Sequence, residues 1–178
     1  MKTITLHNKT FEVFIPETEI AAIIHSMANN INEARIKDPL FIAVLNGSFL
    51  FAADIMRKIT IPNAEISFIK LSSYSGTKTT GKVSELIGIS GDIKDRNIII
   101  LEDIIDTGIT LEKIISLLEK KEVADIKVAT LLFKPKAYTK KIHIDFIGKS
   151  IPNDFVVGYG LDYDEIGRNL PHIYKLKR

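Results

Sequence analysis

The sequence predicts an α/β fold in which a twisted parallel β-sheet is flanked by helices. Two observations lead to this prediction. First, aliphatic runs alternate along the chain with segments whose apolar residues recur at helical spacing. Second, the central strand segments are nearly continuous aliphatic runs, which is typical of parallel strands covered on both faces. No repeat, low-complexity tract or linker interrupts the chain, so we expect a single domain over residues 1–178.

The predicted strands follow from aliphatic runs and from period-two alternation. Residues 64–72 alternate apolar and polar side chains, and the run at 39–48 enters a turn at Asn46–Gly47. Strands are predicted at 11–16, 39–48, 64–72, 97–102 and 126–133, with a late strand in 154–165 that runs into an acidic loop. The segment from Ser73 to Lys82 is rich in Gly, Ser and Thr and predicts a long loop.

Helical spacing marks three segments between these strands. The first helix is predicted from about Glu17 to Arg35, with acidic residues in its first turn. A short helix follows the turn at Asn46–Gly47, and a third follows the strand at 97–102. The apolar residues that define the three helices are Ile20, Ile23, Ile24, Met27 and Ile31, then Phe51 and Ile55, then Leu111, Ile114, Ile115 and Leu118.

Composition excludes several classes of protein. The chain has 24 Lys and Arg residues against 22 Asp and Glu residues. This small net charge does not indicate binding to nucleic acid or to a membrane. The chain has no cysteine, which excludes disulfides, thiol catalysis and thiolate metal sites. The N-terminus lacks the apolar core of a signal peptide, and no aliphatic run approaches the roughly 18 residues of a membrane span. We expect a cytoplasmic protein.

Three carboxylates at the end of a buried strand point to a ligand site. Glu102 and Asp103 follow four aliphatic residues, and Asp106 opens a Thr-Gly-x-Thr turn into the third helix. Ligands of open parallel sheets bind beyond the carboxyl ends of the strands. The turn offers N–H groups, hydroxyls and a helix N-terminus, which together suit a phosphate monoester. The acids then serve hydroxyl groups, a hard cation such as Mg²⁺, or a developing positive charge on the same ligand.

A purely structural interpretation explains only part of this pattern. Asp and Thr before a helix are often N-caps, which accounts for one or two of these residues. It does not account for Glu102 and Asp103. These carboxylates follow four aliphatic residues of a buried strand, and burying a charged carboxylate without a compensating partner is costly. The four histidines show no metal-binding spacing, and His172 has no role that the sequence supplies.

The stretch from Ile98 to Leu111 resembles the phosphoribosyl-diphosphate (PRPP) motif of the type I phosphoribosyltransferases. The wider chain is similar to the hypoxanthine-guanine phosphoribosyltransferase family in particular, in order, from about Phe11 to Tyr174. Four segments carry the resemblance. Residues 44–59 match the first PRPP loop of the family, and residues 70–83 match its mobile loop. Residues 131–136 match the strand end with the lysine that reads the purine, and residues 151–173 match the segment that binds purine and pyrophosphate.

The resemblance implies a fold and a reaction. The fold is a twisted parallel sheet with a small hood over the purine, built from the N-terminal residues and about 135–178. The reaction is Mg²⁺-dependent purine salvage, in which PRPP and hypoxanthine or guanine give IMP or GMP and pyrophosphate. Homodimers or homotetramers are expected.

The resemblance also implies roles for individual residues on the PRPP side. Glu102 and Asp103 hold the ribose hydroxyls, directly or through Mg²⁺, and Asp106 is the general acid/base at purine N7. Arg168 binds pyrophosphate. The 5-phosphate lies in the loop of Asp106, Thr107, Gly108, Ile109 and Thr110, and pyrophosphate meets an unusual backbone conformation at Leu45, Asn46 and Gly47.

Further roles concern the purine and the lid. Lys134 donates to the 6-oxo group, Phe155 stacks on the base, and the Val156 backbone reads its edge. Asp162 ligates a second Mg²⁺ and lies beside the 2-position. The remaining pair, Ser73 and Tyr74, closes over the transition state.

One departure and two alternatives stay open. The family often has a basic residue where this chain has Asn46, so a direct side-chain charge on the leaving group is missing there. An RNA-binding regulator on the same fold, as in pyrimidine-operon attenuators, is one alternative, although it needs a basic face. A transferase for adenine or a pyrimidine is the other.

Overall fold

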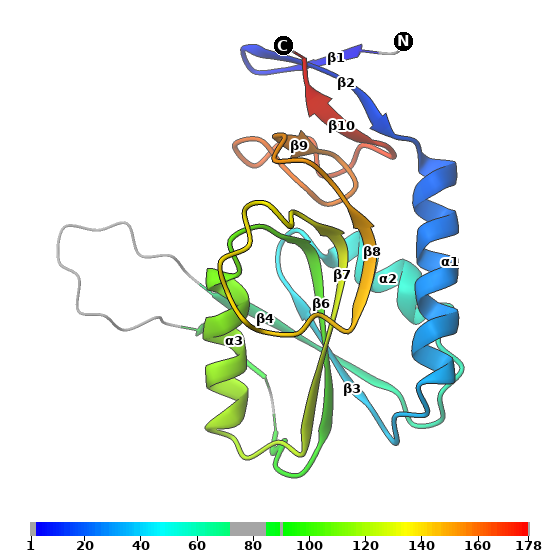
Figure 1. The fold of residues 1–178 in the computed structure, drawn as a ribbon, viewed down its shortest axis with the longest axis vertical. Helices are drawn as coiled ribbons and strands as arrows, with labels where there is room; N and C mark the ends of the chain where they lie inside the picture. The colour runs from blue at the N-terminus through cyan, green and yellow to red at the C-terminus, as the bar shows by residue number, and fades with distance from the viewer. Residues whose placement is uncertain (1–2, 72–84, 90, 178) are drawn as a thin grey trace, which may run out of the picture.

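The computed structural model describes residues 3–71, 85–89 and 91–177. It consists of a large sheet flanked by helices and a smaller sheet that lies above one end of the large one (Figure 1). The predicted lid residues Ser73 and Tyr74 lie outside the described residues.

The large sheet has the strand order β5-β4-β3-β6-β7-β8. Its five parallel strands confirm the predicted parallel sheet, and only β5 runs antiparallel, beside β4. Residues 146–150, which fall in the range expected for the hood, pair with β7 instead. The strands are β3 (Leu40–Val44), β4 (Glu65–Leu71), β5 (Glu85–Ile87), β6 (Asn97–Ile105), β7 (Asp125–Phe133) and β8 (Phe146–Ser150).

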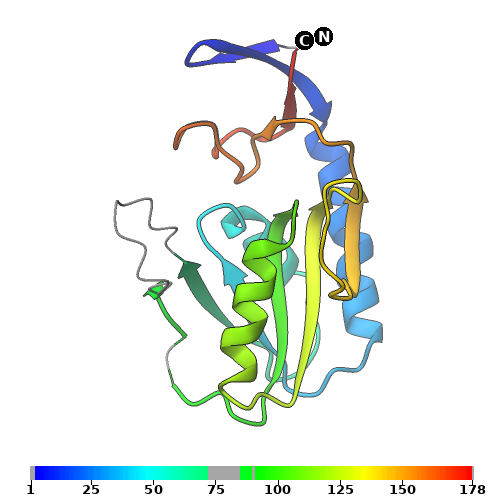
Figure 2. The same ribbon diagram turned by 60° about the vertical axis from the view of Figure 1, so that its left-hand side comes forward.

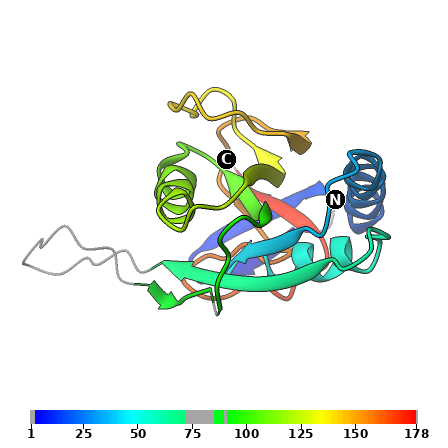
Figure 3. The same cartoon turned by 90° about the horizontal axis from the view of Figure 1, so that it is seen from below.

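Helices cover both faces of this sheet. Alternation along β3 and β6 sends neighbouring side chains to opposite faces, and both faces are buried, which explains the unbroken aliphatic runs. One core packs α1 (Glu17–Glu33) and α2 (Phe49–Met56) on residues such as Phe41 and Ile99. The other packs α3 (Ile109–Glu119) on residues such as Ile42 and Ile100. Figure 3 shows α1 and α3 on opposite sides of the sheet.

The hood is a four-stranded antiparallel sheet made from both ends of the chain. Its order is β1-β2-β10-β9, and Figure 2 shows it above the ends of the large sheet. Phe11, Val157 and Tyr174 form its core. The hood strands are β1 (Thr3–Leu6), β2 (Lys9–Ile15), β9 (Val156–Val157) and β10 (Ile173–Leu176).

The late strand predicted within 154–165 is mostly wrong, because only Val156–Val157 is a strand. The backbone φ angles become positive at Gly158, Tyr159 and Gly160, which ends the extended conformation. The segment continues as tight turns with isolated bridges. These turns carry the chain down toward the large sheet, where the Tyr159 hydroxyl donates to the Asp54 carboxylate on α2.

His172, to which no role was assigned from the sequence, joins the hood to the first helix. Its Nδ1 accepts a hydrogen bond of 3.0 Å from the backbone N–H of Glu17, at the start of α1. One of the first N–H groups of α1 is thereby satisfied.

Within the described ranges, no helix has both the length and the apolar character needed to cross a membrane.

The first prediction concerns the core beneath the site. Ile99 on β6 is 0% exposed, whereas Ile147 on the edge strand β8 is 43% exposed. We expect Ile99→Ala to lower the free energy of unfolding by about 2–5 kcal/mol, because it leaves a cavity between the sheet and the helices. Ile147→Ala, the matched control, should cost about 1 kcal/mol or less. Urea denaturation followed by circular dichroism measures both, and equal losses would contradict this core.

Candidate functional site

The predicted site residues on β6 and in the loops after β3, β6 and β7 lie at the carboxyl ends of these parallel strands. The hood lies above these strand ends (Figure 2). Strand β6 is longer than predicted and continues through Ile105, because it pairs with β7 up to Phe133. Glu102 and Asp103 therefore lie within the strand, and Asp106 follows directly after it.

The two acids of β6 are held in an environment that disfavours their charge. Glu102 is 5% exposed, and burial, with the nearby charge of Asp103, raises its pKa well above the usual range. Burial also raises the pKa of Asp103 to about 6, although the Ile104 N–H (2.9 Å from Oδ1) and the Arg168 charge oppose the shift. Asp162 adds to the increase. This corner is short of positive charge, and a cation or hydroxyl donors would offset the deficit.

The loop after β3 is clamped between β6 and the hood. A cis peptide bond joins Leu45 to Asn46. A Cβ atom on Gly47 would lie 1.7 Å from Oδ2 of Asp103, and one on Gly160 would lie 2.0 Å from the carbonyl oxygen of Gly47. A side chain at Gly160 would collide with backbone and would also have to adopt a φ of +96°, so glycine is required there. A side chain at Gly47 would force the Asp103 carboxylate to move. Three segments that are distant in sequence meet here.

The turn between β6 and α3 is partly exposed, and Thr139 holds it through hydrogen bonds. Gly108 has a left-handed φ of 83°, and α3 begins at Ile109, so the first N–H groups of the helix have no partner within it. The side chains of Thr107 and Thr110 are exposed. Thr139 donates to the carbonyl oxygen of Thr107 through its N–H (3.3 Å) and its hydroxyl (3.1 Å). The Ile109 N–H makes a long contact of 3.5 Å with the Thr107 hydroxyl oxygen. The loop thus presents backbone N–H groups and exposed hydroxyls of the kind that a phosphate binds.

Lys134 meets Asp106 at the end of β7. Its side chain is buried, with 8% of the residue exposed, and its Nζ lies 2.9 Å from Oδ2 of Asp106. The Lys134 N–H also donates to the carbonyl oxygen of Ile105, which holds the ends of β6 and β7 together. A lysine that would ordinarily be solvated is therefore buried against the third carboxylate of the site.

The hood contributes a second charged pair above β6. Arg168 Nη2 lies 2.9 Å from Oδ1 of Asp162, and Arg168 Nη1 donates to the carbonyl oxygen of Gly160 at the clamp. The other oxygen of Asp162 accepts the Glu165 N–H (2.9 Å). Gly160 lies against Gly47, and Gly47 lies against Asp103, so the contact of Arg168 with Gly160 brings this pair close to the acids of β6.

The aromatic residue expected at the purine is on the same hood segment. Phe155 is 42% exposed, whereas Val156 is buried in β9. The exposed ring contacts Phe11 and Tyr163, with centroids 6.1 and 5.7 Å away. Sequence reasoning did not single out Tyr163 or Gly160, because their importance comes from contacts with residues far along the chain.

No cluster of protein ligands alone defines a metal site. Across the described ranges, no three acidic or histidine side chains are grouped so that they could hold a metal ion. Glu102 and Asp103 nevertheless offer hard oxygen ligands with a deficit of positive charge. Mg²⁺ is usually bound by one or two carboxylates together with substrate oxygens and water, so these residues fit it.

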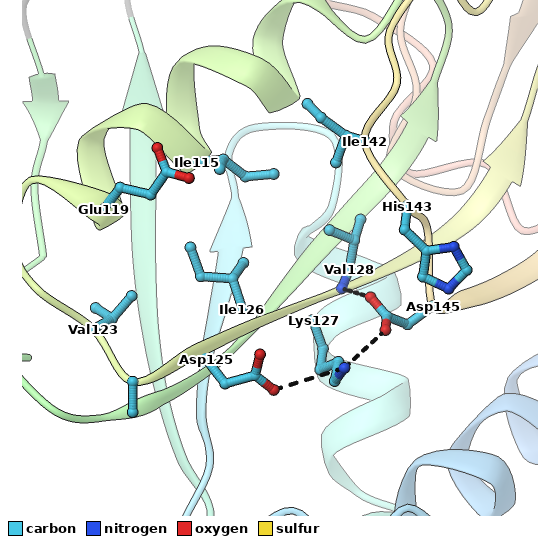
Figure 4. Close-up of a pocket in the computed structure, with 11 residues that line it drawn as sticks. Ile115, Glu119, Val123, Asp125, Ile126, Lys127, Val128, Ile142, His143 and Asp145 are labelled. Atoms are coloured by element: carbon cyan, nitrogen blue, oxygen red, sulfur yellow. Dashed lines mark hydrogen bonds and ion pairs between the residues drawn. The ribbon is translucent and has the colours of Figure 1, made fainter.

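A separate pocket of about 490 Å³ lies at the opposite end of β7 from Lys134 (Figure 4). It is lined by the start of β7, the end of α3 and residues 142–145. Lys127 there pairs with Asp145 (3.2 Å) and with Asp125 (3.7 Å), and Asp145 accepts the Val128 N–H. These groups satisfy one another, and none of the predicted site residues lines this pocket.

The chain is similar in sequence to a family of known proteins. Residues 16–164 match the phosphoribosyl transferase domain family. Hypoxanthine phosphoribosyltransferase of Escherichia coli K12 is 42% identical over 172 residues, covering 94% of this chain and 96% of that protein. Hypoxanthine-guanine phosphoribosyltransferase of Staphylococcus epidermidis is 40% identical over 97% of each chain.

Solved structures of proteins from the same family are similar to this chain in fold. A hypoxanthine-guanine phosphoribosyltransferase from Bacillus anthracis superposes with a TM-score of 0.85 at 38% identity, covering 93% of this chain and 98% of that one. A hypoxanthine phosphoribosyltransferase from Trypanosoma cruzi gives the same TM-score at 30% identity, with 98% and 95% coverage. The chain is a member of the phosphoribosyl transferase domain family, in the branch of the hypoxanthine and hypoxanthine-guanine phosphoribosyltransferases.

Proposed function

We propose that the protein transfers the 5-phosphoribosyl group of PRPP to hypoxanthine and guanine in purine salvage, with Mg²⁺, giving IMP or GMP and pyrophosphate. The observation that carries the proposal is the contact between Lys134 Nζ and Asp106 Oδ2, at 2.9 Å, beside the loop that suits a phosphate. Relatives named hypoxanthine and hypoxanthine-guanine phosphoribosyltransferases support the same substrate class.

The pair of Lys134 and Asp106 matches one edge of a 6-oxopurine. That edge carries the 6-oxo group, an acceptor, next to N7–H, a donor. Lysine only donates and a carboxylate only accepts, so the two side chains complement the two atoms in order. In the free protein the donor and the acceptor satisfy each other. Adenine presents an amino group at position 6, which would face the lysine donor without an acceptor.

The proposed reaction forms a bond between purine N9 and C1 of the ribose while the bond from C1 to pyrophosphate breaks. The bonding electron pair leaves with pyrophosphate, and the N7 proton of the base passes to Asp106. Such displacements have oxocarbenium character, as in glycoside cleavage. The carboxylates of Glu102 and Asp103 then hold the ribose hydroxyls and lie near the positive charge that develops.

The PRPP phosphates use the two loops. The turn from Asp106 to Thr110 binds the 5-phosphate through its backbone N–H groups and hydroxyls. Pyrophosphate lies against Leu45–Gly47 and Arg168, whose guanidinium offsets negative charge on the leaving group. Because Asn46 carries no charge, Arg168 is the cation that we assign to this end of the substrate.

Glu102, Asp103 and Asp162 are the residues that we assign to Mg²⁺, the first two on the ribose side and the third on the pyrophosphate side. The raised pKa values of Glu102 and Asp103 support this assignment, since a bound cation offsets the cost of their ionisation. When bound, Mg²⁺ neutralises the phosphate oxygens and stabilises the leaving group.

The purine site is completed by the hood. Phe155 stacks on the base through its exposed ring, and the backbone near Val156 and Asp162 accepts from the 2-amino group of guanine. Ser73 and Tyr74 are assigned to a lid that excludes water during transfer.

A homodimer or homotetramer is part of the proposal. Three large apolar side chains, Phe49 on α2 and Ile66 and Phe68 on β4, are about 40% exposed. Ile66 and Phe68 lie on one face of β4, and the adjacent Ile69 packs in the core on the α3 side, so both face the side of α1 and α2. A second copy of the chain would cover them.

A panel of bases with PRPP and Mg²⁺ tests the substrate class and the role of Lys134 together. We expect hypoxanthine and guanine to turn over and adenine to be rejected, by up to roughly 10⁴-fold in kcat/KM. Lys134→Ala should lose most turnover of hypoxanthine and narrow the gap to adenine. Lys136→Ala, which removes an exposed lysine two residues away, is the matched control. Unchanged selectivity in Lys134→Ala would remove this lysine from the purine site.

Asp106→Asn tests the proton transfer. Asparagine keeps the size of the side chain and an oxygen that can accept from Lys134, but it cannot take the N7 proton. We expect a folded protein that still binds PRPP and whose kcat is lower by about 10²-fold or more. A kcat within a few-fold of the parent, together with a collapse of PRPP affinity, would identify Asp106 as a binding residue only.

The metal requirement follows from the hard oxygen ligands. Turnover should disappear in excess EDTA and return with Mg²⁺ or Mn²⁺, because both ions prefer carboxylate and phosphate oxygens. The measurement is initial rate against free metal concentration. Full turnover in the chelator would contradict the assignment of Glu102, Asp103 and Asp162.

A further inference from the structure

We propose that Tyr163 is a positioning residue for the purine. It fixes the ring of Phe155 with help from the N-terminal hairpin, through the turn residues His7 and Asn8 and through Lys9, the first residue of β2. The inference rests on the proposed function, in which Phe155 is the platform for the base. It assigns a role to a tyrosine and to an N-terminal turn that the reaction scheme does not otherwise use.

Three aromatic rings of the hood contact one another. Tyr163 meets Phe155 edge to face, with centroids 5.7 Å apart and planes at 84°. Phe11 is tilted against both rings, each at 6.1 Å. Phe11 is fully buried, whereas Phe155 is 42% exposed. The cluster therefore has an anchored inner end and an exposed outer ring, and Tyr163 contacts both.

The hairpin turn holds Tyr163 from the other side. The Tyr163 hydroxyl donates to Oδ1 of Asn8 (3.0 Å), and the His7 ring meets the tyrosine ring at 85° with centroids 5.3 Å apart. Lys9 Nζ lies over the Tyr163 ring, 4.6 Å from its centroid. Three consecutive residues, the two of the turn and the first of β2, thus each make a different contact with this one side chain.

The same lysine restricts the platform itself. Lys9 Nζ lies over the Phe155 ring, 5.5 Å from its centroid, and so covers one face of that ring. A base that stacks on Phe155 then uses the other face. Because offset stacking depends on the plane of the ring, an edge contact from Tyr163 and a cation on the covered face fix the geometry that the base meets.

Tyr163 also links the platform to the charged pair of the hood. The preceding residue, Asp162, is bound by Arg168 and by the Glu165 N–H, and the Tyr163 backbone exchanges hydrogen bonds with Ile166 at 3.0 and 3.3 Å. The backbone of the tyrosine is therefore held in a hydrogen-bonded turn. Its side chain contacts Phe155 from this fixed position.

The test compares Tyr163→Leu, which removes the ring, with Tyr163→Phe, which removes only the hydroxyl. For Tyr163→Leu we expect a KM for hypoxanthine about tenfold higher, in line with the loss of an aromatic pair. Its KM for PRPP should stay within about twofold, because the loops at 45–47 and 106–110 are untouched. Tyr163→Phe should restore the KM for hypoxanthine to within about threefold of the parent, since the ring contacts remain.

A spectroscopic measurement separates positioning from general stability. The chain has no tryptophan, so Phe155→Trp places a single reporter at the platform. In that background, IMP should quench the emission, and adding Tyr163→Leu should lower the fluorescence anisotropy of the free protein and weaken the quenching. A parental KM for hypoxanthine and parental anisotropy after Tyr163→Leu would overturn the inference, and so would an equal rise in both KM values.

If Tyr163→Leu does not fold, Lys9→Met decides the question. It removes the cation over both rings, and we expect the KM for hypoxanthine to rise about threefold with the KM for PRPP unchanged. A parental KM for hypoxanthine in this variant would then contradict the inference. Failure of the proposed function would look different, because the parent protein itself would not turn over any 6-oxopurine.

Discussion

The ion pair of Lys134 and Asp106 ties together the ends of β6 and β7, the two strands whose loops carry most of the candidate site. The backbone bond from Lys134 to Ile105 fixes the same junction. Asp106 is followed by the turn into α3, so the pair lies beside the N-terminus of that helix. In the proposed reaction, the base inserts its 6-oxo group and N7–H between a donor and an acceptor that are already aligned.

A second constraint is the electrostatic balance above β6. Glu102 and Asp103 are desolvated, and this burial raises the pKa of both carboxyl groups, so a nearby positive charge would favour their ionised forms. The hood supplies such a charge through Arg168, which is itself held by Asp162 and by the Gly160 carbonyl. The clamp at Gly47 brings the loop after β3 against both. The hood therefore adds charged groups to the candidate site as well as lying above it.

Local pattern was enough to predict the parallel sheet, the first helix and the position of the acids. Aliphatic periodicity and the strand-helix alternation are properties of short segments, and α1 ends within two residues of its predicted bound. The short strands β1, β5, β8 and β10 were not predicted because they carry little periodic signal. The late strand was mostly wrong because positive φ angles follow Val157.

The parts of the site that sequence could not reveal are contacts between distant residues. Gly47 meets Gly160, Lys134 meets Asp106, and Asn8 meets Tyr163 across 155 positions of the chain. Lys134, Phe155, Asp162 and Arg168 could be named only through resemblance, since each is unremarkable in its local sequence. Burial of Lys134 and exposure of Phe155 are properties of the folded chain alone.

The central claim is that Lys134 and Asp106 separate to receive one edge of a 6-oxopurine. A crystal structure of the protein with IMP tests it most directly. We predict that Lys134 Nζ lies within about 3 Å of the purine O6 and that an oxygen of Asp106 lies at N7. An IMP complex in which Lys134 still contacts Asp106, with the base bound away from both, would contradict the account.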